Sequence, residues 1–199
     1  MSRWIKPVSL RGSKVILEPL GMQHAAGLID AASDGKLWEL WYTKIPAPAD
    51  MDTYVAKALS MREADGAIPF VVIEAATGDV VGCTRIFAVD AENQRAEIGY
   101  TWYAKRVQRS TVNTESKLLL LQHAFESLGA IAIEFRTHWH NHASRRAIAR
   151  LGAKQDGVLR HHQKSPDGVF RDTVVFSIIA AEWPTVRQAL TFKLTNRDD

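Results

Sequence analysis

Residues 97 to 146 carry the pattern that most constrains the fold of this chain. They begin with a strand-like run, Glu97-Ile98-Gly99-Tyr100-Thr101-Trp102, and pass through a polar turn into a leucine-rich segment, expected to be helical over 113–128 and ended by Gly129. A second strand is expected over 131–138, and Asn141 then begins a second helix. A strand–helix–strand crossover joins elements of one sheet, and the N–H groups at a helix start form a site for a phosphate group.

The segments on either side of this pattern complete an α+β fold. Apolar runs predict strands over 14–20, 68–75, 80–89 and 96–103, and the short turns between the last three imply an antiparallel meander. Helical spacing predicts helices over 22–33, 52–64, 144–151 and 182–194. A hairpin is expected over 157–164 and 169–180, turned at 165–168. We expect one domain over 1–199, built on a mixed, mostly antiparallel sheet with helices on both faces.

Composition and charge exclude several other classes of protein. The chain is 46% hydrophobic and 24% charged, and it contains neither an apolar run of about 20 residues nor a signal-peptide core, so we expect a cytoplasmic protein with no membrane partner. The single cysteine, Cys83, excludes an internal disulfide framework and a cysteine metal cluster. The net charge of +3 comes from scattered residues, with one cluster at Arg145, Arg146 and Arg150 beside the expected phosphate site, which suits a small anion better than a nucleic acid.

Several motifs resemble those of one family of enzymes. The turn Gln108-Arg109-Ser110-Thr111-Val112-Asn113 resembles the fingerprint Q/R-x-x-G-x-G/A of the GNAT N-acetyltransferases, although Thr111 and Asn113 replace its small residues. The run 97–102, Asn141-x-x-Ser144 and the segments after it resemble the RimJ/RimL-like group of that family. The resemblance covers roughly residues 15–179 and is strongest from Glu97 onward.

The resemblance implies acetyl-CoA as cosubstrate, with no metal. The turn would hold the pyrophosphate, helped by the hydroxyl groups of Ser110, Thr111 and Thr114 and by the charge of Arg145. The pantetheine would lie along the strand at Tyr100 to Trp102, and Asn141 would donate or accept a hydrogen bond there. The expected cofactor-binding residues are Tyr100, Thr101, Trp102, Gln108, Arg109, Ser110, Thr111, Val112, Asn113, Thr114, Asn141, Ser144 and Arg145.

Three residues are candidates for the chemistry of acetyl transfer by direct attack of an amine. Ser144 would protonate the departing thiolate, a role implied by the resemblance. Glu97 is the leading candidate for the general base, and the alternative is a structural ion pair with Arg95 or Arg136. His162 is the second candidate, because Gln163 stands where the relatives have a glutamate and an amide cannot accept a proton.

Other functions and partners stay open from the sequence. A catalytically silent CoA-binding regulatory protein is the main alternative, and an RNA-associated module lacks the aromatic platform it would need. The histidines at 138, 140, 142, 161 and 162 lack the carboxylate or cysteine pattern of a metal site. The acceptor is an amine: a protein N-terminus, an amino acid, a polyamine or an antibiotic. Trp38, Trp41 and Tyr42 belong either to the core or to the wall of the acceptor pocket.

The terminal helix raises the question of assembly. Trp183, Val186, Leu190 and Leu194 recur at helical spacing. Such a stripe either caps the chain's own fold or meets a second copy, so a homodimer is one of two expectations.

Overall fold

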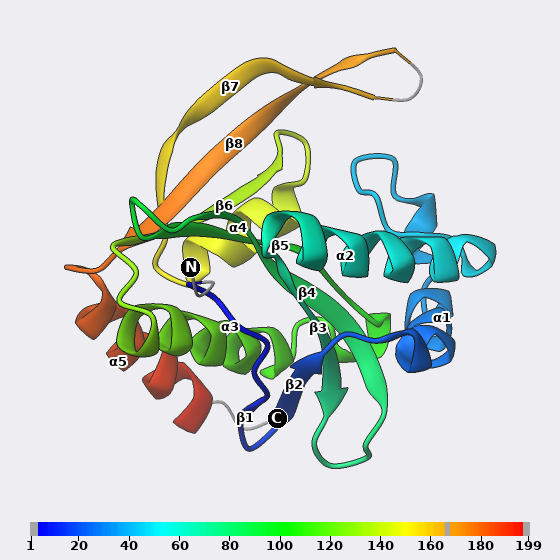
Figure 1. Cartoon of the computed structure of the whole chain (residues 1–199), viewed down its shortest axis with the longest axis horizontal. Helices are drawn as coiled ribbons and strands as arrows, with labels where there is room; N and C mark the ends of the chain where they lie inside the picture. Colours follow the sequence, from blue (N-terminus) through cyan, green and yellow to red (C-terminus); the bar gives the residue numbers. More distant parts are fainter. Residues whose placement is uncertain (1–3, 166–167, 197–199) are drawn as a thin grey trace.

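A single eight-stranded sheet runs through the computed structural model, which describes residues 4–165 and 168–196. The strand order is β1-β2-β3-β4-β5-β6-β8-β7; neighbouring strands are antiparallel except for the parallel pair β5 and β6. The strands are β1 (Leu10–Arg11), β2 (Val15–Pro19), β3 (Ile68–Glu74), β4 (Val80–Asp90), β5 (Arg95–Tyr103), β6 (Ala132–His138), β7 (Lys154–Lys164) and β8 (Phe170–Ile179). The predicted mixed, mostly antiparallel sheet is confirmed (Figure 1).

Helices cover both faces of the sheet, as predicted. They are α1 (Ala25–Ser33), α2 (Met51–Asp65), α3 (Val112–Gln122), α4 (His142–Arg150) and α5 (Trp183–Thr195). Short helical turns are η1 (Met22–His24), η2 (Leu37–Glu39), η3 (Pro48–Asp50), η4 (Lys105–Val107) and the π-helical turn η5 (His123–Ser127). Tyr54 of α2 contacts Cys83 of β4, whereas Lys117 of α3 contacts the next residue, Thr84. Because successive strand residues point to opposite faces, α2 and α3 lie on opposite sides.

Several of the predicted boundaries differ from those in the structure. The long helix begins at Val112, one residue earlier than predicted, with Thr111 at its N-cap position, and the Ser110 hydroxyl accepts the Val112 N–H at 3.2 Å. Its α-helical part ends at Gln122, and the last turn widens into η5 before Gly129, which has the predicted left-handed conformation. Strand β7 begins at Lys154, three residues earlier than expected. Of the predicted hairpin turn, residues 166 and 167 lie outside the described residues.

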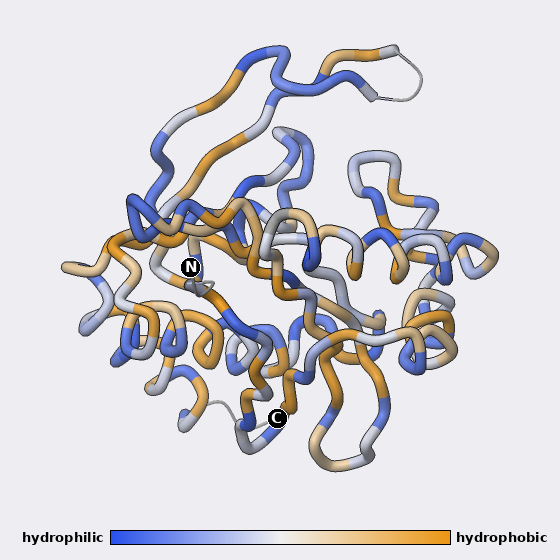
Figure 2. The backbone as a smooth tube through the Cα atoms, viewed as in Figure 1, coloured by the Kyte–Doolittle hydropathy of each residue, from blue (hydrophilic) through white to orange (hydrophobic). Residues whose placement is uncertain are grey.

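The apolar core lies between the sheet and its helices. Its largest fully buried side chains come from the strands and from α1, α2 and α3, and the apolar segments of the chain gather there (Figure 2). Trp183, Val186 and Leu190 of α5 are buried inside the chain's own fold, where α5 packs on α3 and the Trp183 ring stacks on Phe125. The apolar stripe of the terminal helix is therefore used within the chain. No helix in the described ranges is long and apolar enough to cross a bilayer.

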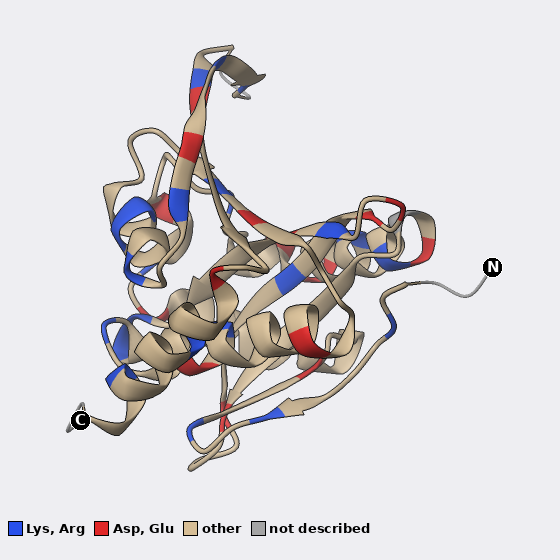
Figure 3. Cartoon of the chain, turned by 90° about the vertical axis from the view of Figure 1, so that its left-hand side faces the viewer, with Lys and Arg blue, Asp and Glu red and all other residues tan. Residues whose placement is uncertain are grey.

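The β7–β8 hairpin projects away from the rest of the molecule (Figure 1). Most residues of β7 are exposed, and the hairpin carries basic and acidic segments along its length (Figure 3). Its base is held by β6, which pairs with β8 from Ala132↔Ile179 to His138↔Thr173.

A buried carboxylate ties α3 to the start of the sheet. Glu115 accepts hydrogen bonds from the backbone N–H groups of Ser13, Lys14 and Val15 and from the Ser13 hydroxyl, at 2.7–2.9 Å. A Cβ atom at Gly12 would lie 2.5 Å from the carboxyl carbon of Glu115. The backbone at residue 12 can therefore lie this close to the Glu115 carboxylate only because Gly12 has no side chain.

We expect Glu115→Gln to destabilise the protein by about 3 kcal/mol, since an amide NH₂ would face backbone donors. Urea unfolding measures this free energy. Glu39→Gln is the matched control, because Glu39 is exposed and its ion pair with Lys36 is long at 3.9 Å; it should change stability by roughly 0.5 kcal/mol or less. Equal effects of the two substitutions would contradict the assigned role of Glu115.

Candidate active site

The parallel ladder between β5 and β6 is very short. It comprises Arg95↔Ala132, Ala96↔Ile133 and Glu97↔Glu134, and no further β5–β6 pair follows among the described residues. Both strands continue beyond this point, so residues 98–103 and 135–138 form two facing edges that we call the β5–β6 gap. Strand edges without partners present backbone N–H and C=O groups to a ligand with amide groups of its own.

A bulge in β5 lies along this gap. Cys83 pairs with Trp102 and Arg85 with Gly99, so Tyr100 and Thr101 together oppose Thr84. Tyr100 has a left-handed backbone with φ of +51°. A Cβ atom at Gly82, which faces the bulged strand, would lie 2.1 Å from the Trp102 carbonyl oxygen. Bulges of this kind redirect backbone groups, and this one occurs in the part of the strand along which the resemblance implies that the pantetheine lies.

A buried lysine supports the bulge from the α3 side. The Lys117 ammonium group donates to the hydroxyl groups of Thr101 at 2.7 Å and Thr84 at 3.0 Å. Burial lowers the pKa of Lys117 to about 7, and no carboxylate pairs with it in the part of the chain that the structure describes. The sequence analysis missed this residue, because its place in a leucine-rich helix gives no sign that it faces the sheet.

The predicted phosphate turn lies directly after β5, but most of its side chains hold the turn itself. The Gln108 side chain donates to the Tyr103 carbonyl at 3.0 Å, and the Ser110 hydroxyl donates to the Val107 carbonyl at 2.7 Å. Arg109 adopts the left-handed conformation with φ of +67°, whereas Thr111, which replaces the fingerprint glycine, has an ordinary φ of −77°. The Thr111 backbone therefore does not require glycine.

The positive charge beside this turn comes from a residue that the prediction did not assign. Arg145 lies on the Trp139 ring at 4.3 Å and donates to the Trp139 carbonyl, so the structure does not place it at the start of α3. Arg150 does reach that start, where it donates to the Thr114 hydroxyl at 3.3 Å. The two arginines are five residues apart and so lie on different faces of α4, a helical-phase argument that the sequence would have allowed.

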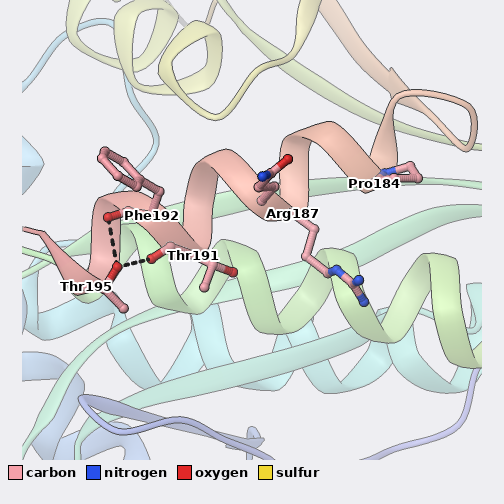
Figure 4. A pocket seen from close by; sticks show the side chains of 6 residues that line it. Pro184, Arg187, Thr191, Phe192 and Thr195 are labelled. Carbon is pink, nitrogen blue, oxygen red and sulfur yellow. Dashed lines mark hydrogen bonds between the residues drawn. The ribbon is translucent and has the colours of Figure 1, made fainter.

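A cavity of about 290 Å³ lies at this point. It is bounded by the start of α3, the end of α4 and the end of α5, and is lined by Thr111, Thr114, Arg150, Phe192, Lys193 and Asn196. A helix N-terminus with two cationic side chains suits an anion. A second cavity, of about 530 Å³, is lined by α5 alone and contains none of the predicted site residues (Figure 4).

The start of α4 is capped as its sequence suggests. The Asn141 side-chain oxygen accepts the Ser144 N–H at 3.0 Å, so this oxygen serves the helix rather than a ligand. The Ser144 hydroxyl makes no hydrogen bond to any described residue. It is half-buried and available for chemistry at the end of β6.

Glu97 occupies the last rung of the ladder. Its carboxylate lies 3.5 Å from the Arg136 guanidinium, which is one of the two ion pairs considered from the sequence; Arg95 pairs with Glu134 instead. Burial raises the pKa of Glu97 to about 7, against the opposing effect of Arg136. A carboxylate with a pKa near neutrality is suited to accept a proton.

His162 lies two strands away from the gap. Its Nδ1 is 3.1 Å from the Thr173 hydroxyl of β8, and β8 separates it from β6. The structure therefore does not bring His162 and Glu97 together.

The end of β6 carries an aromatic cluster at the open end of the gap. Trp41 is 72% exposed, and its ring contacts those of His138 at 5.3 Å and His140 at 5.7 Å, whereas Trp38 packs against the core. Trp41 therefore lies beside the end of β6 and Trp38 against the core, and a role for Trp41 in the acceptor pocket stays a prediction. No group of three or more potential metal ligands is found among the described residues.

Comparison with known proteins places these features in a family. A family model described as an acetyltransferase (GNAT) domain matches residues 14–154. The protein named "Putative ribosomal N-acetyltransferase YdaF" of Bacillus subtilis (strain 168) is 29% identical over 53% of this chain, which spans 57% of that protein's length. The N-acetyltransferase p20 of Bacillus licheniformis is 29% identical over 57% of this chain and 63% of its own length. The matches thus span less than two thirds of these relatives. A crystal structure of a GCN5-related N-acetyltransferase from Brucella melitensis is 30% identical, with a TM-score of 0.87 over 99% of this chain and 90% of that one.

The lowered pKa of Lys117 predicts a specific pH dependence of stability. Between about pH 7 and pH 10.5, the usual pKa of lysine, residue 117 binds more protons in the unfolded chain than in the folded one. The contribution of Lys117 to the free energy of unfolding therefore rises with pH. We expect the unfolding free energy of the wild type, relative to Lys117→Met, to increase by about 1 to 3 kcal/mol from pH 7 to pH 9.5. The matched control is Lys57→Met on the exposed side of α2. A difference between wild type and Lys117→Met that does not change with pH would contradict the burial of a titrating amine.

Proposed function

Because the chain belongs to the GNAT acetyltransferase family, we propose that it transfers the acetyl group of acetyl-CoA to a primary amine by direct attack within a ternary complex. The observation that carries this proposal is the β5–β6 gap with the Tyr100–Thr101 bulge on one edge and a helix start immediately after that strand. Localisation in the cytoplasm and action as one domain over 1–199 stay predictions.

The proposed cofactor path begins at the start of α3. The pyrophosphate would bind the N–H groups of the first turn of α3, beside the residues from Gln108 to Thr114, with Arg150 and Lys193 supplying positive charge. From there the pantetheine would run along the β5 edge at Tyr100 to Trp102, where its amides pair with the strand. The thioester would then lie at the bulge, with Ser144 as the proposed proton donor. A contribution from Arg145 would require its side chain to leave the Trp139 ring.

The proposed chemistry is a single displacement. The neutral amine attacks the thioester carbonyl carbon, a C–N bond forms, and backbone N–H groups at the bulge stabilise the oxyanion. The C–S bond then breaks, and the Ser144 hydroxyl donates a proton to the thiolate. Ser144 regains a proton through water, so that overall the proton released by the amine is the one gained by the thiol. Glu97 lies three residues before Tyr100, roughly 10 Å along the strand, so the amine's proton would reach it through water. The acetyl group never bonds to the protein, and Cys83 stays a buried thiol hydrogen-bonded to Tyr54.

The second candidate function is a CoA-binding regulatory protein without catalysis. The observation in its favour is the Gln163 side chain, which cannot act as a base and stands where the resemblance implies a glutamate. Turnover with a panel of amines separates the two functions, whereas CoA binding is common to both.

We expect CoA to bind at least about tenfold more tightly than pantetheine, because only CoA carries the phosphates that the start of α3 would hold. Isothermal titration calorimetry measures both affinities. Arg150→Gln should weaken CoA binding by about tenfold and leave pantetheine binding unchanged. The matched control, Arg146→Gln, removes an exposed arginine of the same helix and should change neither. Equal affinities for CoA and pantetheine would overturn the phosphate assignment.

The pKa of Glu97 predicts the pH dependence of turnover. A base acts when deprotonated, so the rate should rise with pH through about 7, and Glu97→Gln should abolish this acidic limb. His162→Gln, which removes the other candidate, should keep it. If both Glu97→Gln and His162→Gln retain the acidic limb, neither residue is the base.

Ser144→Ala should lower kcat by about tenfold with little change in CoA affinity.

A further inference from the structure

The Nε atom of Arg171, a half-buried residue of β8, is buried without a hydrogen-bond acceptor in the described ranges. Among the described residues, the Nε of Arg171 is buried and has no hydrogen-bond partner, and no ion pair is formed by this side chain. Desolvation lowers the pKa of Arg171. Leaving a buried donor without an acceptor costs about 1–3 kcal/mol, more for a charged group, so such a donor calls for an acceptor from elsewhere.

Arg171 lies on the same face of the sheet as His138, the residue at the end of β6 beside the β5–β6 gap. It is two residues from Thr173, which pairs across the sheet with His138 and hydrogen-bonds His162. Residues two apart on a strand share a face of the sheet. The charge of Arg171 also contributes to the lowered pKa of His138. Arg171, His138 and His162 therefore form one cluster, which we call the β8 basic cluster.

The β8 basic cluster lies at the level of the bulge. His138 is four residues beyond Glu134 on β6, and Thr101 is four residues beyond Glu97 on β5, with Glu97 and Glu134 paired. Because the Tyr100–Thr101 bulge adds one residue to β5, the position four strand steps beyond Glu97 is Trp102, so His138 stands across the gap at the end of the bulge. A group held by the cluster would thus lie near an amine that attacks a thioester at the bulge.

The cluster offers hydrogen-bond donors rather than acceptors. The His138 Nδ1 accepts the His140 N–H at 3.0 Å, so its neutral ring carries its proton on Nε2. Burial, Arg171 and His140 lower the pKa of His138, which keeps the ring neutral. The acidic neighbour, Asp172, is already engaged by Arg160 at 3.0 Å and by the His161 N–H at 2.8 Å. The site therefore has unbalanced positive charge.

We propose that the β8 basic cluster binds a carboxylate of the acceptor, so that the substrate is an amine carrying a carboxylate close to its amino group. The Arg171 guanidinium would hold the carboxylate, His138 would donate a second hydrogen bond, and the Trp41 ring would cover the bound acceptor. This inference rests on the proposed acetyl transfer. The carboxylate belongs either to a free amino acid or to an acidic side chain beside a peptide's N-terminus.

The test compares matched substrates with and without the carboxylate. One arm uses amino acids and their carboxamides, and the other uses peptides with Asp or Asn at the second position, each corrected for the fraction of neutral amine. One of the two arms contains the carboxylate that the site binds. In that arm we expect kcat/KM to be at least tenfold higher for the substrate that carries the carboxylate than for its neutral counterpart. Arg171→Gln should remove this preference through KM and leave the neutral member within about twofold, and Arg171→Lys should retain part of it.

Arg160→Gln is the matched control, because Arg160 is an exposed arginine of the same hairpin that pairs with Asp172; it should keep the preference. The absence of a preference in both arms, or an equal loss for acidic and neutral members in Arg171→Gln, would overturn the carboxylate site. Turnover of neutral amines together with CoA binding would leave the acetyltransferase proposal standing in that case. Loss of CoA binding and of all turnover in the wild type would instead contradict the acetyltransferase proposal itself.

Discussion

The early end of the β5–β6 ladder is the constraint on which the rest of the site depends. Three residue pairs join the two strands, and each strand then continues with one edge exposed to the gap. Backbone hydrogen-bonding groups rarely stay unpaired in a folded protein, so a ligand with amides is the natural partner for such edges. The pantetheine arm of CoA has this chemistry, and the proposed cofactor path therefore joins the bulge to the start of α3, which follows it along the chain.

Helix α3 is tied to the sheet at two separate places through buried polar groups. Glu115 fixes the residues that lead into β2, and Lys117 fixes the bulge through Thr101 and Thr84. Both side chains are buried, which costs solvation and requires their hydrogen bonds to be kept. Glu115 and Lys117 both extend from the helix whose first turn is proposed to bind phosphate. A movement of α3 on CoA binding would therefore displace the bulge through Lys117.

The sequence allowed the order of elements to be predicted because that order depends on local signals. The crossover, the meander and the cap at Asn141 follow from periodicity and capping, and the structure contains all three. The choice of Arg150 over Arg145, the burial of Lys117 and the isolation of Arg171 depend on which face of a helix or strand meets its neighbours. The burial of Lys117 and Arg171 depends on contacts between distant segments, so the sequence did not reveal these two residues. Which arginine binds the phosphate, Arg145 or Arg150, stays a prediction.

Amide hydrogen exchange with and without CoA tests the central claim, the path of the cofactor, most directly. CoA should slow exchange at residues 98–103 of β5 and at residues 111–115 at the start of α3, because the ligand would occupy the free strand edge and the first helical turn. The β2–β3 side of the sheet should show little change. Protection confined to the outer face of α5, or strong binding without protection of residues 98–103, would contradict a cofactor bound in the β5–β6 gap.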